Sequence, residues 1–172
     1  GLGESGRHSK SESERLQTWG PLWPGRIMPT LTDAHATDHA TDLAYQNQIL
    51  VEVSRTFALT IPQLPGHLRA VVGNAYLLCR IADTIEDSEV LTLDEKRHFY
   101  DAFASVLAEG LPAESFARDL APQLKGSVLP AEVDLVRNTA RVFRIYRGFG
   151  DPERAALLRC VRIMAEGMEA YQ

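Results

Sequence analysis

The sequence predicts an all-α protein, and three observations support this fold class. After about residue 42, hydrophobic residues recur every three or four positions, which is the period of an amphipathic helix. Residues that begin and end helices stand between these segments, and strand-like alternation is hard to find. The chain has 172 residues, of which 45% are hydrophobic, enough for one domain with a sizeable core.

The first two helices are expected on either side of an apolar turn that contains two prolines. The first covers about 42–53 and the second about 65–88. Pro65 suits the first turn of the second helix, because the amide groups there have no partner within the helix. This second helix is apolar around most of its circumference, which predicts that it is buried.

The remaining helices are predicted from their boundary residues. Thr92 and Glu95 have capping-box spacing and open a helix, and Gly126 closes the one that follows. Pro130 precedes another helix, and Asp151 stands as an N-cap before the last. In order, these helices are expected at about 92–109, 113–125, 131–146 and 151–172.

Residues 1–41 form a polar lead that we interpret as disordered or non-native, so that 42–172 is the folded domain. Residues 1–27 are rich in Ser, Gly, Glu and Arg and show no period. At the other end the pattern is still helical at Gln172, with no C-cap residues. The sequence therefore suggests a fragment of a longer helical domain.

Two charged groups are expected to be solvated surface. The segment DHATD, Asp38 to Asp42, could resemble a metal site together with His35 and His39, but we expect a flexible, solvated segment. The second group is a basic cluster on the predicted helix 131–146, formed by Arg137, Arg141 and Arg144.

Charge and composition exclude several classes of protein. The net charge is −5 and the pI is near 5.5, so nucleic acid is not expected as a partner. The apolar runs are too short and interrupted to span a bilayer, and no secretory signal is visible. The two cysteines, Cys79 and Cys160, are expected to be reduced core thiols, which favours a cytoplasmic protein.

A polar stripe on the predicted helix 65–88 is the strongest indication of chemistry. Its spacings are 4, 3, 4, 3 and 4, so its members share one face: Arg69, Gly73, Tyr76, Arg80, Asp83 and Asp87. A surface stripe with an Arg80–Asp83 pair is the simple interpretation. However, if Arg80 pairs with one acid, the others, with Glu86, remain in excess. Hard carboxylate donors suit Mg²⁺, which bridges to substrate phosphates. The carboxylates would thus hold the metal ion, and the metal ion would hold a diphosphate. Tyr76 would then lie deeper, beside the chain attached to that diphosphate.

A second motif precedes this helix, in the segment SRTFALTIPQLP from Ser54 to Pro65. By itself it is weak and is consistent with packing of an apolar turn. Arg55 lies in an otherwise apolar run, so we expect a buried anion or a surface carboxylate to meet it.

Together these motifs closely resemble the squalene/phytoene synthases, head-to-head prenyltransferases with the all-α isoprenoid synthase fold. In that family an SR-x-F element precedes a helix with the pattern Y-x-x-x-R-x-x-D-x-x-E-D, and both stand here in order, in SRTF and LPGHLRAVVGNAYLLCRIADTIEDS. The tail CVRIMAEGMEAYQ is similar to the helix before the central cavity helices of the family. The resemblance implies an incomplete helical bundle around a central cavity.

The resemblance also implies roles for these residues. The family joins two prenyl diphosphates, farnesyl for squalene or geranylgeranyl for phytoene, through a cyclopropyl intermediate. Asp83 and Asp87 would bind Mg²⁺, supported by Glu86. The diphosphate would be contacted by Ser54, Arg55 and Arg80, and the allylic cation by Phe57 and Tyr76. A squalene product would require NADPH. For Phe57, a core position is an equally good interpretation.

One family motif is missing from the sequence. A second aspartate-rich motif is expected downstream of Gln172, so the fragment is not expected to be active alone. The SRTFALTIPQLP segment favours the bacterial squalene branch, with phytoene synthesis as the alternative. A non-catalytic helical module that binds a basic partner is the alternative from another class. Peripheral membrane contact stays open, and the sequence does not predict an oligomeric state.

Overall fold

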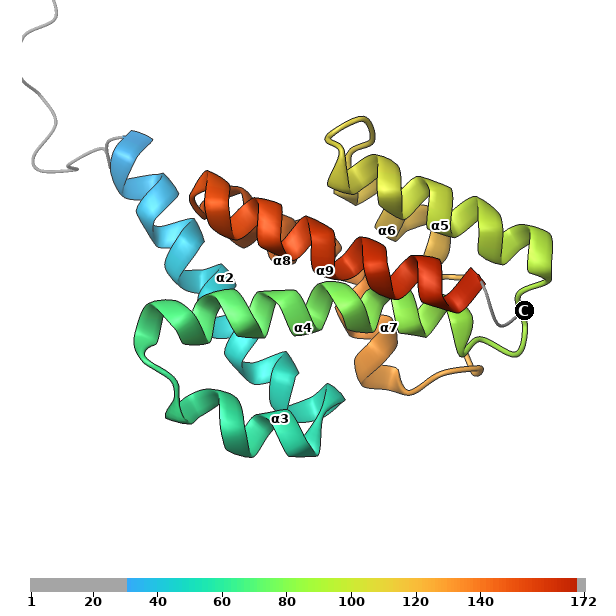
Figure 1. The fold of residues 1–172 in the computed structure, drawn as a ribbon, viewed down its shortest axis with the longest axis horizontal. Coiled ribbons are helices and arrows are strands. Elements are labelled where there is room, and N and C mark those ends of the chain that lie inside the picture. Colours follow the sequence, from blue (N-terminus) through green and yellow to red (C-terminus); the bar gives the residue numbers. More distant parts are fainter. Residues whose placement is uncertain (1–30, 170–172) are drawn as a thin grey trace, which may run out of the picture.

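The computed structural model describes residues 31–169, except for the side chains of residues 31–37, 58 and 165–169. This part of the chain is helical, with no strand (Figure 1). The elements are α2 (Leu31–Val53), α3 (Arg55–Thr60), the 3₁₀ helix η1 (Ile61–Gln63), α4 (Gly66–Glu86), α5 (Leu93–Leu107), α6 (Ala113–Leu120), α7 (Pro130–Arg137), α8 (Thr139–Arg147) and α9 (Asp151–Glu169). The predicted fold class is confirmed.

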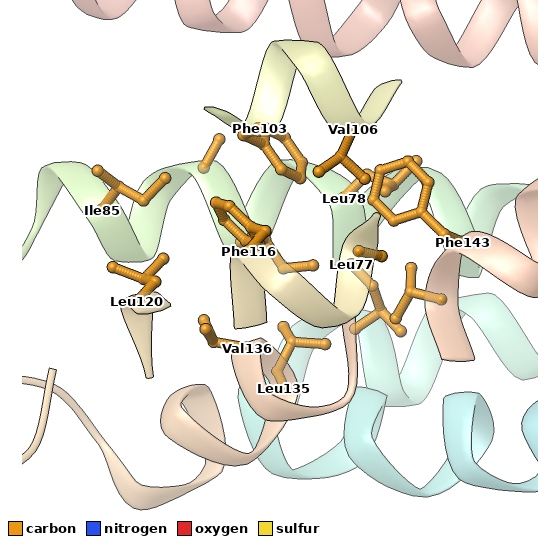
Figure 2. Packing of buried hydrophobic residues seen from close by; sticks show 14 of the residues in the cluster. Leu77, Leu78, Ile85, Phe103, Val106, Phe116, Leu120, Leu135, Val136 and Phe143 are labelled. Atoms are coloured by element: carbon orange, nitrogen blue, oxygen red, sulfur yellow. The ribbon is translucent and has the colours of Figure 1, made fainter. Parts of the chain in front are cut away.

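Helix α4 is the centre of the bundle and packs against α2, α5, α7, α8 and α9 (Figure 1). Its side chains Leu77, Leu78 and Ile85 are fully buried. They meet phenylalanines from three other helices, and Figure 2 shows Phe103, Phe116 and Phe143 over these positions. The expectation that this helix is buried around most of its circumference is therefore confirmed. Burial of such side chains stabilises a domain by about 1.5–3 kcal/mol each.

Helices α2 and α4 approach closely at Gly73. A Cβ atom there would lie 2.9 Å from Leu50 Cδ1 and 3.1 Å from Gln46 Nε2. Gln46 is itself held in place, because its Nε2 donates to the Ala70 carbonyl at 2.9 Å and its Oε1 accepts from Asn74 Nδ2 at 3.1 Å. Gly73 therefore serves helix packing and does not belong to a polar stripe.

Helix α2 begins earlier than predicted, at Leu31 instead of residue 42. The expected disordered lead is thus helical from Leu31 on, while residues 1–30 lie outside the described part. Helix α2 is joined to α8 by a salt bridge, in which the buried Asp42 carboxylate accepts from Arg141 Nε at 2.9 Å and from Arg144 Nε at 2.7 Å. The prediction that Asp42 is solvated is wrong, because its carboxylate joins α2 to α8. Arg141 is partly buried, whereas Arg137 and Arg144 are exposed, as expected.

Two other predicted helices differ in their bounds. The expected helix 131–146 is divided into α7 and α8 at Asn138, whose Nδ2 donates to the Asp134 carbonyl at 2.9 Å. Such side-chain bonds compete with the helix ladder. The expected helix 113–125 ends at Leu120, and turns follow up to Gly126, which has a φ of 83°. The capping box at Thr92 is confirmed.

The cysteines lie on two helices that pack together, Cys79 on α4 and Cys160 on α9, and both are free thiols. Cys79 packs against the core, but Cys160 is exposed, so the expectation of a second core thiol is wrong. Within the described residues, no helix is long and apolar enough to cross a membrane.

Candidate functional site

The C-terminal half of α4 presents an acidic cluster, which we define as Arg80, Asp83, Asp87 and Glu132. Spacings of three and four residues place Arg80, Asp83 and Asp87 on one face of the helix. Glu132 comes from the first turn of α7, which packs against α4. The cluster therefore combines a face that the sequence predicts with one residue from a distant helix.

Arg80 pairs with three carboxylates, whereas the sequence suggested one. Its Nη1 lies 3.7 Å from Asp83 Oδ2 and 3.7 Å from Asp87 Oδ2. Its Nη2 donates a close hydrogen bond to Oε1 of Glu132. Its Nε is buried and has no hydrogen-bond partner within the described residues. One cation at the centre of three anions leaves the cluster with an excess of two negative charges.

Glu132 is the site residue that sequence reasoning missed. Its side chain is only 4% exposed, and its Oε2 accepts from the Leu129 amide at 3.1 Å. One sequence signal could have indicated this contact to Leu129. Glu132 is the third residue of a helix that begins at Pro130, and a glutamate there often accepts a hydrogen bond from the backbone amide of the residue before the helix. Nothing in the local sequence indicated that it would meet Arg80.

The charges of the cluster shift the proton affinities of its members. Burial raises the pKa of Asp83; Arg80 lowers it, and the nearby Asp87 and Glu86 raise it further, so the net shift is upward. Burial lowers the pKa of Arg80, but the hydrogen bond and the charge of Glu132 outweigh burial and raise it. Crowded carboxylates of this kind favour a cation that can offset their charge.

The end of α4 adds two more groups to this region. Glu86 is half-buried, and its backbone carbonyl accepts a close hydrogen bond from Lys96 Nζ on α5. Asp87 is the C-cap residue and is the most exposed acid of the cluster, at 60%. Lys96 therefore holds the backbone at the end of the helix, while the Asp87 carboxylate stays accessible to a ligand.

The donor set of Asp83 and Asp87 fits a hard divalent cation. Both carboxylates approach the same nitrogen of Arg80 and stand one helical turn apart. Mg²⁺ is commonly held by one or two carboxylates, with waters and substrate phosphates as the other ligands. Within the described side chains no group of three His, Cys, Asp or Glu residues gathers as a complete metal site. Asp83 and Asp87 could therefore supply part of the coordination of such a cation.

The SRTF segment forms α3 and its cap, where the sequence suggested a turn. Ser54 is the N-cap residue, and its Oγ accepts from the Phe57 amide at 3.2 Å, which leaves its hydroxyl proton free to donate. Arg55 is exposed, and no carboxylate of the described residues pairs with it, so the expected partner is not found there. The Phe57 ring lies 4.5 Å from the Tyr76 ring, and Tyr76 donates to the Val53 carbonyl at 3.3 Å.

A pocket of about 240 Å³ lies beside this aromatic pair. Arg69 is at its edge and is fixed by the carbonyls of Pro62 at 2.5 Å and Leu64 at 3.2 Å. Arg69 therefore serves η1 and the pocket, not the acidic cluster. Most of the lining comes from α2, α3 and η1: Asn47, Leu50, Val51, Phe57, Ile61, Pro62 and Arg69. Along α4, the acidic cluster, the Phe57–Tyr76 pair and this pocket follow one another.

Fold and site together define an all-α protein of the isoprenoid synthase class, with an acidic helix face at one end of its central helix. Residues 50–172 match the family described as squalene/phytoene synthase. The chain belongs to this family, whose members are prenyltransferases that act on prenyl diphosphates.

The relatives that match include a squalene synthase, a phytoene synthase and a lycopaoctaene synthase. The chain is 28% identical over 155 residues to a lycopaoctaene synthase of Botryococcus braunii, covering 86% of the chain and 32% of the relative. It is 30% identical over 125 residues to a squalene synthase of Schizosaccharomyces pombe, covering 72% and 25%. It is 30% identical over 120 residues to a bifunctional lycopene cyclase/phytoene synthase of Sporisorium reilianum, covering 67% and 17%. The chain thus spans a third or less of these relatives, and no solved structure matches it.

Proposed function

We propose that the full-length protein joins two molecules of farnesyl diphosphate head-to-head to form squalene, through presqualene diphosphate and with Mg²⁺. The observation that supports this most directly is the acidic cluster with its excess of carboxylates on α4. The squalene synthases among the relatives favour farnesyl diphosphate as the substrate. The second reaction, from presqualene diphosphate to squalene, would use NADPH as the reductant.

The acidic end of α4 would bind the diphosphate. Asp83 and Asp87 would hold Mg²⁺, with Glu86 adding negative charge beside them. The metal ion would supply positive charge to the departing diphosphate. Arg80 would donate to diphosphate oxygens through Nη1, whose contacts to the aspartates are 3.7 Å long. Ser54 and Arg55, at the start of α3, would bind the same anion, because Arg55 is exposed and the Ser54 proton is free.

The aromatic pair and the pocket would receive the hydrocarbon part of the substrate. The rings of Phe57 and Tyr76 lie against each other, and Phe57 lines the pocket together with the apolar Leu50 and Ile61. Electron-rich ring faces stabilise a neighbouring cation, and a dry wall keeps water away from an allylic cation. The order along α4, with carboxylates at one end and apolar lining toward the other, matches a molecule that has a charged head and an apolar chain.

Condensation of two geranylgeranyl diphosphates to phytoene is the second candidate. It is favoured by the bifunctional lycopene cyclase/phytoene synthase among the relatives. The two reactions differ in the length of the substrate and in the need for NADPH. Either substrate is amphiphilic and either product is an oil, so peripheral contact of a cytoplasmic protein with a membrane belongs to the same proposal.

The test is turnover by the full-length protein. Incubation with farnesyl diphosphate, Mg²⁺ and NADPH should give squalene in the lipid extract, and presqualene diphosphate should accumulate when NADPH is omitted. Consumption of geranylgeranyl diphosphate alone would overturn the squalene assignment. Absence of product from both substrates would favour a non-catalytic helical module instead.

A matched set of variants tests the acidic cluster. Asp83→Asn and Asp87→Asn should each abolish turnover with little loss of helicity, because each removes a metal-binding charge and keeps the shape of the side chain. Asp101→Asn is the control, since Asp101 is an exposed acid on α5, away from the cluster. Near-normal turnover in both cluster variants would support a simple surface stripe.

A further inference from the structure

Glu132 approaches Arg80 from the side opposite to the aspartates. The guanidinium uses Nη2 for Glu132 and Nη1 for Asp83 and Asp87. The contact to Glu132 is a close hydrogen bond, whereas 3.7 Å to each aspartate is beyond the usual length of an N–H···O bond. The strongest pairing of Arg80 is therefore with the residue that the sequence did not indicate.

Glu132 is well placed to keep this pairing. Its carboxylate is 4% exposed and is fixed at its other oxygen by the Leu129 amide, in the first turn of α7, where the helix dipole favours an anion. Asp83 and Asp87 are 34% and 60% exposed, so water competes for their oxygens. A pre-organised buried anion is a better partner for the guanidinium than two partly hydrated ones.

We infer that Glu132 is a positioning residue: it holds the Arg80 guanidinium, so that Asp83 and Asp87 keep their negative charge free for a divalent cation. The inference rests on the proposed function, because it assigns a role toward the metal and diphosphate of that same site. Without Glu132, the guanidinium is free to turn toward the aspartates and take the place of the cation.

Counting charges gives the size of the effect. Three carboxylates and one guanidinium give the cluster a charge of −2, and removal of the Glu132 charge changes it to −1. The other charged groups in this region, Glu86 on α4 and Lys96 on α5, are the same in both states. Loss of one unit of charge within several ångströms of a divalent cation, in a water-like environment, weakens its binding by roughly tenfold.

The experiment measures Mg²⁺ binding to the substrate-free, full-length protein by isothermal titration calorimetry. Glu132→Gln should weaken binding roughly tenfold. Glu109→Gln should leave it unchanged, because Glu109 is an exposed acid that lies 3.9 Å from Arg147, away from the cluster. Circular dichroism should show that each variant keeps its helicity.

A double variant separates positioning from a merely structural role. In the double variant Arg80→Gln/Glu132→Gln no guanidinium remains beside the aspartates, and the cluster has a charge of −2, as in the wild type. Mg²⁺ affinity should therefore recover to that of the wild type, although Arg80 is absent. Because both members of the buried pair become neutral, this variant also avoids an unpaired buried charge.

The outcomes are distinguishable. Wild-type Mg²⁺ affinity in Glu132→Gln, or no recovery of affinity in the double variant, would overturn the inference. Neither result would overturn the proposed function, provided that turnover by the wild type depends on Mg²⁺. A wild-type protein that binds no Mg²⁺ without substrate would overturn the inference. If its turnover were also independent of Mg²⁺, the proposed function would be overturned with it.

Discussion

The salt bridge between α2 and α8 permits a prediction whose size follows from the structure. The carboxylate of Asp42 is 3% exposed and accepts from Arg141 Nε at 2.9 Å, from Arg144 Nε at 2.7 Å and from Arg144 Nη2 at 2.9 Å. In Asp42→Asn the side chain keeps one oxygen acceptor but loses its charge. Since α2 leads into Ser54 and supplies the Val53 carbonyl that binds Tyr76, this salt bridge also supports the candidate site.

The expected loss is about 2–3 kcal/mol in the free energy of unfolding. Hydrogen bonds to charged groups contribute about 1.5–3 kcal/mol each, and breaking a fully buried ion pair costs about 3–5 kcal/mol. The effect here is smaller than the sum of the bonds, because Arg141 and Arg144 are 25% and 48% exposed and can turn to water. The amide that replaces the carboxylate also retains one oxygen acceptor for them.

The pH dependence gives an independent check. Burial raises the pKa of Asp42, but the hydrogen bonds and charges of Arg144 and Arg141 outweigh it, so the pKa lies below its ordinary value of 3.8. Because the pKa of Asp42 is lower in the folded protein, its salt bridge stabilises the fold fully at pH values above the ordinary pKa. This stabilisation is lost as the pH falls through the pKa of Asp42 in the folded protein. The difference between the wild type and the variant should therefore be full at pH 7 and should shrink as pH falls below about 4.

The assay is urea denaturation of the full-length protein, followed by circular dichroism at pH 7 and at pH 3. Asp101→Asn is the control for loss of an exposed carboxylate. A difference below about 0.5 kcal/mol between wild type and Asp42→Asn at pH 7, which is the usual effect of a surface substitution, would refute the reasoning. A difference of the same size at both pH values would refute the charge account.

Three further outcomes are expected. Gly73→Ala should destabilise the protein by about 1–3 kcal/mol through overpacking, and Gly66→Ala should not, because nothing lies within 4 Å of its added Cβ; denaturation midpoints would decide, and equal midpoints would contradict the close approach. Thr92→Ala should cost about 1 kcal/mol through loss of the N-cap, and an unchanged midpoint would count against that capping role. Burial, with smaller effects of Cys160 and Asp83, raises the pKa of Cys79 to about 12, so at pH 8 peptide mapping should find Cys160 labelled by a thiol reagent well before Cys79; equal rates would contradict this.

Much of the fold could be predicted because helix formation depends on local patterns. The apolar period of α4 predicted its burial, and Thr92 with Glu95 marked the start of α5 to within one residue. The split at Asn138 was missed, since an asparagine side chain bonds to the backbone within a segment that otherwise keeps a helical period. The burial of Asp42 was also missed, because its partners Arg141 and Arg144 lie about 100 residues away in the sequence.

The candidate site was only partly predictable for the same reason. The spacing of Arg80, Asp83 and Asp87 placed them on one face, and the structure brings them together. The spacing also assigned Gly73 to that face, but the structure turns it toward α2. Residue spacing predicts which side chains share a face of a helix. It does not predict which other helix packs against that face.

The sequence by itself determined that this protein is all-α, where its central helix lies, and that three acids gather near the end of that helix, because these properties depend on residues within a few turns of one another. The tertiary structure decided the partners: Glu132 for Arg80, 52 residues away, and Arg144 for Asp42, 102 residues away. The physical reason is that a buried charge must be paired, and the pairing partner is chosen by which helices pack together. Packing of distant segments depends on the whole core, which no local pattern contains.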